Sequence, residues 1–154
     1  MDDQRAYQII CEGLRQTELQ LEDLQSIATS SEARAFQFAG YCVLIATFAS
    51  PFAEKLPNPL AFYLCAAGLM FSAVWAIYSV IPRRFHIRGH RWEDWKDHIP
   101  DNDSLVAVLI SQADENDARI KFNYEVLEQS AMHFRVSFCF ALVSVSIFSI
   151  GQLF

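Results

Sequence analysis

Three long stretches of the chain carry almost no charge, and they limit the possible folds more than any other feature. Glu54 and Lys55 are the only charged residues from position 36 to position 81. No charged residue follows Arg135. A helix of about 20 mainly apolar residues crosses a bilayer core of about 30 Å. The sequence therefore predicts three transmembrane helices, at 35–53, 59–81 and 134–154.

The composition agrees with a membrane protein of the all-α class. Apolar residues make up 53% of the 154 residues, and charged residues only 19%, whereas soluble domains usually have about 25% charged residues. The alternative is a soluble protein with a buried three-helix core. We disfavour it because helices that are apolar on all sides would need a larger covering shell than the remaining residues supply.

The charges that flank the three stretches predict an orientation. Because the link at 54–58 is short, the first two spans form a hairpin, which places 31–34 and 82–91 on one side of the membrane. Lys55 lies on the other side, and cytoplasmic loops carry the excess of Lys and Arg. We therefore expect the inner (cytoplasmic) membrane, with the N-terminus cytoplasmic and the C-terminus outside. The positive residues on the predicted cytoplasmic side are Arg34, Arg83, Arg84, Arg88, Arg91, Lys96, Arg119, Lys121 and Arg135.

Two long amphipathic segments, 1–34 and 104–133, precede the first and third spans. Neither Gly nor Pro occurs from Ser104 to Ile150, so the second segment should be one helix continuous with the third span. A single arm is a marginal helix in water, so we expect the two arms to pack against each other and against copies from other subunits. The first segment repeats apolar residues at helical spacing at Tyr7, Ile10, Leu14, Leu21, Leu24 and Ala28, with Thr17 in register. The second does so at Val106, Leu109, Ala113, Ile120, Leu127 and Phe134.

A line of polar residues accompanies the second stripe, because Asn116, Asn123 and Ser130 are seven residues apart. Buried polar residues at a helical seam can specify register and oligomeric state. This favours a homo-oligomer, although a ligand-binding or pore-lining row stays open as an alternative. The predicted oligomer seam comprises Leu14, Leu21, Asn116, Ile120, Asn123 and Leu127.

The linker at 82–103 combines arginines, histidines and tryptophans directly after the second span. Anionic headgroups attract such arginines, and tryptophan suits the membrane interface. The same residue types could instead bind a nucleotide, with Arg on phosphate and Trp against a base. His86 and His90 alone are weak evidence for zinc. The candidate ligand-binding residues are Arg84, His86, Arg88, His90, Arg91, Trp92 and Trp95.

The sequence has no GxSxG, HExxH, P-loop or GxGxxG motif, so we expect no enzymatic activity and no cofactor. The neighbouring carboxylates Asp114, Glu115 and Asp117 point in different directions from a helix, so they suit a solvated face better than a metal site. We expect no metal and no nucleic-acid partner. The expected partners are the lipid bilayer, further copies of the chain, and either a nucleotide signal or a cytoplasmic protein.

The order of these features resembles known membrane proteins. A polar helix leads into "SEARAFQFAGYCVLIATFA", and "ENDARIKFNYEVLEQSAMHFRVSF" leads into the last span. In layout this resembles small prokaryotic multi-span proteins, including the SLATT-type and Pycsar-type transmembrane effectors of anti-phage signalling, which commonly have two or four spans. The resemblance implies a homo-oligomeric effector whose cytoplasmic arms receive a signal, such as a nucleotide, and open or disrupt the membrane. The alternatives are a non-catalytic scaffold subunit that docks a cytoplasmic partner and a pore former without a ligand.

Overall fold

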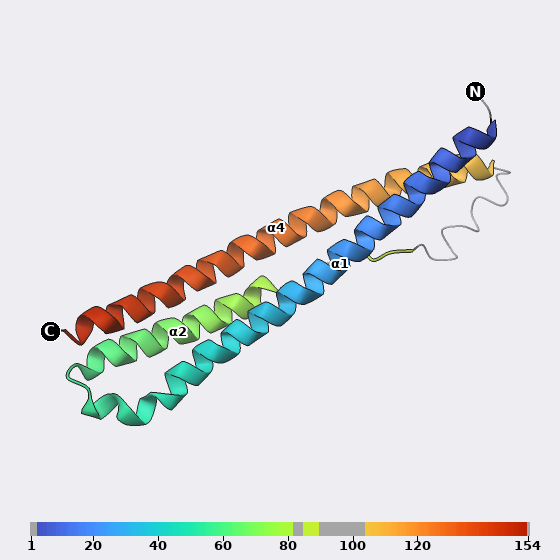
Figure 1. Cartoon of the computed structure of the whole chain (residues 1–154). Helices are drawn as coiled ribbons and strands as arrows, with labels where there is room; N and C mark the ends of the chain where they lie inside the picture. The colour runs from blue at the N-terminus through green and yellow to red at the C-terminus, as the bar shows by residue number, and fades with distance from the viewer. Residues whose placement is uncertain (1–2, 82–84, 90–103, 154) are drawn as a thin grey trace. The chain divides into compact units, whose positions relative to one another are not determined.

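The computed structural model describes residues 3–81, 85–89 and 104–153, and its regular structure there is entirely helical (Figure 1). The helices are α1 (Asp3–Phe48), the 3-10 helix η1 (Ser50–Lys55), α2 (Pro59–Ser79) and α4 (Leu105–Gly151). The all-helical class predicted from the sequence is confirmed for these residues.

Prolines and an asparagine cap determine where the first helices end and begin. α1 ends at Phe48, and Pro51 opens the 3-10 helix that follows. A proline disfavours the α conformation at the residue before it, so α1 is shorter than the span predicted to reach Ala53. Asn58 caps α2, because its Oδ1 accepts the N–H of Ala61 at 3.2 Å. The pyrrolidine of Pro59 suits the first helical turn, where no partner for an N–H exists.

α4 is a single helix of 47 residues, as the absence of Gly and Pro predicted. Ser104 caps its start, since the Oγ atom accepts the N–H of Ala107 at 3.2 Å. At 1.5 Å per residue such a helix is about 70 Å long.

The chain forms two compact units, and both long helices contribute to each. The first unit contains Met1–Ala28 and Arg84–Val126, and the second contains Thr29–Arg83 and Leu127–Phe154. We call the first the arm unit and the second the apolar unit.

In the arm unit α1 and α4 pair side by side and run in the same direction (Figure 1). The predicted stripes form the contact: Leu21 and Leu24 of α1 and Leu109 and Ile120 of α4 are buried. The start of the α1 stripe lies outside this core, because Tyr7 is 41% exposed. The predicted periodicity therefore identified the buried faces of both arms except at Tyr7 and at Val106, which is 39% exposed.

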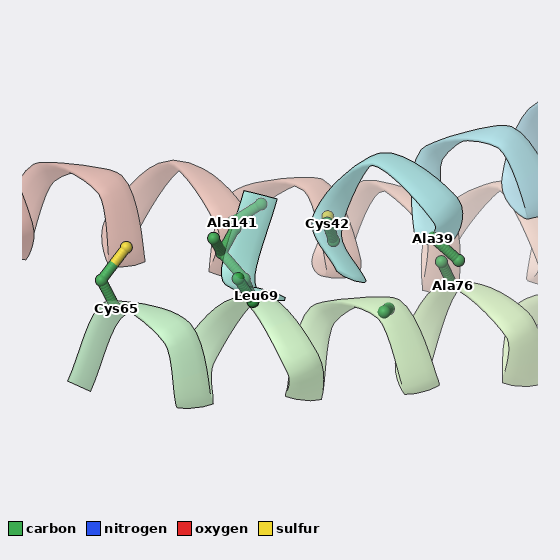
Figure 2. Close-up of a cluster of buried hydrophobic side chains, with 8 residues drawn as sticks. Ala39, Cys42, Cys65, Leu69, Ala76 and Ala141 are labelled. Atoms are coloured by element: carbon green, nitrogen blue, oxygen red, sulfur yellow. The ribbon is translucent and has the colours of Figure 1, made fainter. Parts of the chain in front are cut away.

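In the apolar unit three helices meet through small side chains (Figure 2). Small residues let helix backbones approach closely, which is typical of helix contacts in membranes. At one such approach, a Cβ atom on Gly68 would overlap with Ser144 of α4. The core consists of Ala39, Cys42 and Ala46 of α1, Cys65, Leu69, Ala73 and Ala76 of α2, and Ala141 of α4.

A reciprocal hydrogen-bond pair also joins α2 to α4 in this unit. Ser72 Oγ donates to the Ser137 carbonyl at 2.5 Å, and Ser137 Oγ donates to the Ser72 carbonyl at 2.7 Å. Both serines are buried. At the start of α2, Gln152 Nε2 donates to the carbonyl of the capping residue Asn58 at 2.9 Å.

Two helices, α2 and α4, are long and apolar enough to cross a membrane. Most of their large apolar side chains in the apolar unit are exposed, including Leu64, Val74, Leu142 and Val143. The predicted first span does not satisfy the same criterion, because α1 ends at Phe48 and retains only part of it.

Candidate functional site

The strap, which we define as Phe85–Gly89, is the described part of the predicted linker and belongs to the arm unit. It has no helical structure. Since a segment without regular secondary structure does not pair its own backbone groups, its position depends on bonds to neighbouring elements. Side chains of α4 supply these backbone bonds, and side chains of α1 bind the strap through Arg88.

Asn123 of α4 holds the backbone of the strap with both ends of its amide group. Asn123 Nδ2 donates to the His86 carbonyl at 2.8 Å, and the His86 N–H donates to Asn123 Oδ1 at 2.9 Å. Asn123 is 0% exposed. A primary amide presents a donor and an acceptor side by side, so it can pair with one extended residue as a neighbouring strand would. We call this pair of bonds the Asn123 clamp.

Two further contacts join the strap to α4. Arg119 Nη1 donates to the Gly89 carbonyl at 3.3 Å, while its Nη2 is held by Glu115 at 2.6 Å. Gly89 has φ +93°, a conformation that glycine adopts without the steric cost of a side chain. The His86 ring meets the Phe122 ring edge to face, with centroids 5.1 Å apart.

Arg88 links the strap to α1 by charge. Its Nη1 atom lies 2.8 Å from Glu22 Oε2, and its Nη2 atom lies 3.5 Å from Glu18 Oε2. Glu18 and Glu22 are four residues apart and so share one face of α1. Half of the Arg88 side chain is exposed. The strap therefore connects both arms, with a buried amide clamp on α4 and a half-exposed ion pair on α1.

A buried polar layer joins the arms directly. Asn116 Nδ2 donates to Thr17 Oγ1 at 3.1 Å, and Thr17 Oγ1 in turn donates to the Leu14 carbonyl at 2.9 Å. Asn116 Oδ1 has no hydrogen-bond partner among the described residues. A polar residue at one seam position penalises shifted registers, because any shift would leave it against apolar side chains.

The residues of the predicted oligomer seam pack within the chain. Leu21, Asn116, Ile120 and Asn123 are buried, and Leu14 and Leu127 are half-buried. The seam is thus occupied by the chain's own α1, α4 and strap. An assembly of several copies stays a prediction.

Of the predicted ligand-binding residues, the structure describes His86 and Arg88. Both are exposed, but α4 binds the His86 backbone and α1 binds the Arg88 guanidinium. The remaining candidates lie outside the described residues; they are Arg84, His90, Arg91, Trp92 and Trp95. Sequence reasoning did not identify Glu18 and Glu22, although two acids one turn apart are a visible signal for a cationic partner.

Charge also organises the start of α1, away from the strap. Arg15 Nη2 and Gln16 Nε2 each donate to Glu12 Oε1 at 2.7 Å. The hydrogen bonds from Arg15 and Gln16 lower the pKa of Glu12 to about 2. No group of three or more His, Cys, Asp or Glu side chains in the described part of the chain could hold a metal ion.

Comparison with family models, with curated proteins and with solved structures finds no match for this chain. Any function proposed for it must therefore follow from its residues and their geometry.

Proposed function

We propose that the chain is a homo-oligomeric membrane effector. Its arm unit receives a signal in the cytoplasm, and a change in arm packing opens or disrupts the bilayer through the apolar unit. The proposed topology has three spans, with the N-terminus cytoplasmic and the C-terminus outside. The first of these spans is the part of the chain from Ala35 to Ala53.

The observation that carries this proposal is that the two long helices are shared by the two units. α1 and α4 each continue from the arm unit into the apolar unit without a break in the helix. A helix interior transmits rotation or displacement along its length because each turn is hydrogen-bonded to the next. A signal that changes how the arms pair would thereby reach the helices that contact lipid.

The packing of the apolar unit supports the first span, the one that α1 contributes. Ala39, Cys42 and Ala46 of α1 belong to the same core as α2 and α4, while Tyr41, Leu44 and Ile45 are exposed. Such large apolar side chains on the outer surface of a helix suit lipid better than water.

A scaffold subunit that docks a cytoplasmic protein is the second candidate. It is favoured by the apolar side chains that the arm unit leaves exposed, among them Ile9 at 60% and Tyr124 at 59%. A scaffold would bind a partner through such residues without changing membrane permeability.

Topology is tested by cysteine labelling in a background without native cysteines. Lys55 in the hairpin and Lys121 in the arm are both exposed, and cysteines at these positions should react with an impermeant reagent from opposite sides of the membrane. Reaction of both from the same side would contradict the three-span arrangement.

Effector activity is tested by membrane potential in cells that express the full chain. We expect depolarisation, and a change in its extent with Thr17→Asp, which places a charge in the buried layer opposite Asn116. Gln20→Asp is the matched control, because Gln20 is exposed on the same helix. An unchanged potential with the wild-type chain would favour the scaffold. Equal effects of the two variants on depolarisation would show that the packing of the arms does not control the membrane.

A further inference from the structure

The contacts of the strap with the two arms differ in kind. Towards α4, the strap is held mainly by the neutral hydrogen bonds of the Asn123 clamp, with one further bond from Arg119 to the Gly89 carbonyl. Towards α1, the described contacts are the ion pairs of Arg88 with Glu18 and Glu22. The same short segment is thus attached to one helix by its backbone and to the other by one side chain.

The two attachments also differ in exposure, which determines how each responds to ions. Asn123 is 0% exposed, so dissolved ions have little access to its bonds. Arg88, Glu18 and Glu22 have side chains that are 50%, 30% and 59% exposed. At such exposure, charge interactions are screened over about 8 Å at physiological ionic strength and over about 3 Å at 1 M salt. Salt should therefore weaken the α1 attachment and leave the α4 attachment in place.

Loss of Arg88 from α1 would have a further effect on that helix. Glu18 and Glu22 are like charges at i and i+4, which destabilise a helix unless a cation lies between them. Arg88 supplies this cation from a position 66 residues away in the sequence. Leu21 lies between the two acids in sequence and is fully buried in the arm pair. The ion pairs thus lie beside the apolar contact that holds α1 in the arm unit.

We propose that the strap is a charge-operated latch on the α1 arm. In the closed state Arg88 neutralises Glu18 and Glu22 and keeps α1 paired. When ions screen or capture Arg88, the strap stays on α4 through the Asn123 clamp, and α1 loses one of its attachments. The inference rests on the proposed function only for what the freed arm then does to the membrane.

The latch is tested by hydrogen–deuterium exchange of the full chain in lipid nanodiscs. Arg88→Glu should raise exchange in peptides that cover Glu18 and Glu22 by about 2- to 5-fold, the range for exposed ion pairs. Peptides covering the strap should keep their protection. The second substitution Glu22→Arg, added to Arg88→Glu, restores an opposite-charge pair and should return α1 exchange to the wild-type level.

The matched control is Lys121→Glu, which makes the same charge change at an exposed position of the arm unit. Peptides from 134–150 should exchange equally in all variants, which shows that the apolar unit is folded. Raising salt from 0.05 M to 1 M should increase α1 exchange in the wild type to about the level of Arg88→Gln, because screening removes the attraction without adding repulsion, and it should have little effect in Arg88→Gln itself.

Three results would overturn the latch. They are equal opening of the strap and α1 in Arg88→Glu, no rescue by Glu22→Arg, and an effect of Lys121→Glu as large as that of Arg88→Glu. Because the exchange readout does not depend on membrane activity, failure of the latch and failure of the effector function are separate outcomes. A chain that never depolarises the membrane can still show the latch.

Discussion

Replacing Asn123 with alanine removes the clamp that holds the strap on α4. The change deletes two hydrogen bonds, from Asn123 Nδ2 to the His86 carbonyl and from the His86 N–H to Asn123 Oδ1. It leaves the Arg88 ion pairs and the Arg119 contact in place. Since alanine favours helix more than asparagine does, α4 itself should not be weakened by a loss of helix propensity.

The magnitude follows from these two bonds. A neutral hydrogen bond contributes about 0.5–1.5 kcal/mol net, so the pair contributes about 1–3 kcal/mol. His86 is exposed, so water can replace part of the lost bonding, and we expect the lower part of this range. A loss of about 1–2 kcal/mol raises the local opening equilibrium of the strap by about 5- to 30-fold.

Hydrogen exchange measures this effect directly, because the His86 amide is one of the two donors in the clamp. Exchange in peptides covering Phe85–Gly89 should increase by this factor in Asn123→Ala. Lys121→Ala is the control, since Lys121 is exposed on the same helix. If strap exchange in Asn123→Ala stays within 2-fold of the control, the clamp contributes no measurable stability, and the reasoning about the strap is wrong.

Three further predictions concern the helix contacts and pH. Gly68→Ala should lower the thermal stability of the detergent-solubilised chain, because the added Cβ overlaps a neighbouring helix, while Gly40→Ala should not, because nothing lies within 4 Å of its added Cβ. Ser137→Ala should destabilise the apolar unit by about 0.6–1.7 kcal/mol per lost interhelical hydrogen bond, and a denaturant titration that shows no change would contradict this. The Glu12 pKa is lowered from 4.5 to about 2, so the stabilisation of α1 by this carboxylate is present above pH 4.5 and is lost as pH falls through about 2. NMR titration of Glu12 should show its midpoint near 2 in the wild type and closer to 4.5 in Arg15→Gln.

The clearest success of sequence reasoning is the helix arrangement along the chain. α4 is continuous because no residue from Ser104 to Ile150 breaks a helix, and α2 begins at Pro59, where the predicted second span begins. The seam positions were also predictable, since heptad spacing identifies which side of a helix is apolar. The boundary at Phe48 was less predictable, because Pro51 disfavours the preceding α conformation without specifying where the helix yields to a 3-10 turn.

The sequence predicted that the two arms pack against each other, but the residue that each polar side chain binds was decided only by the tertiary structure. Heptad spacing predicts that Asn123 lies at a seam, but an asparagine side chain can bind another subunit, a ligand or the chain's own backbone equally well. Here it binds the His86 backbone, 37 residues earlier in the sequence. Likewise, two acids four residues apart on one helix face, Glu18 and Glu22, indicate a nearby cation. The structure shows that this cation is Arg88 of the strap. Periodicity is a local property of the chain. These contacts instead depend on how a non-helical segment lies against two helices, which the packing of the arm unit determines.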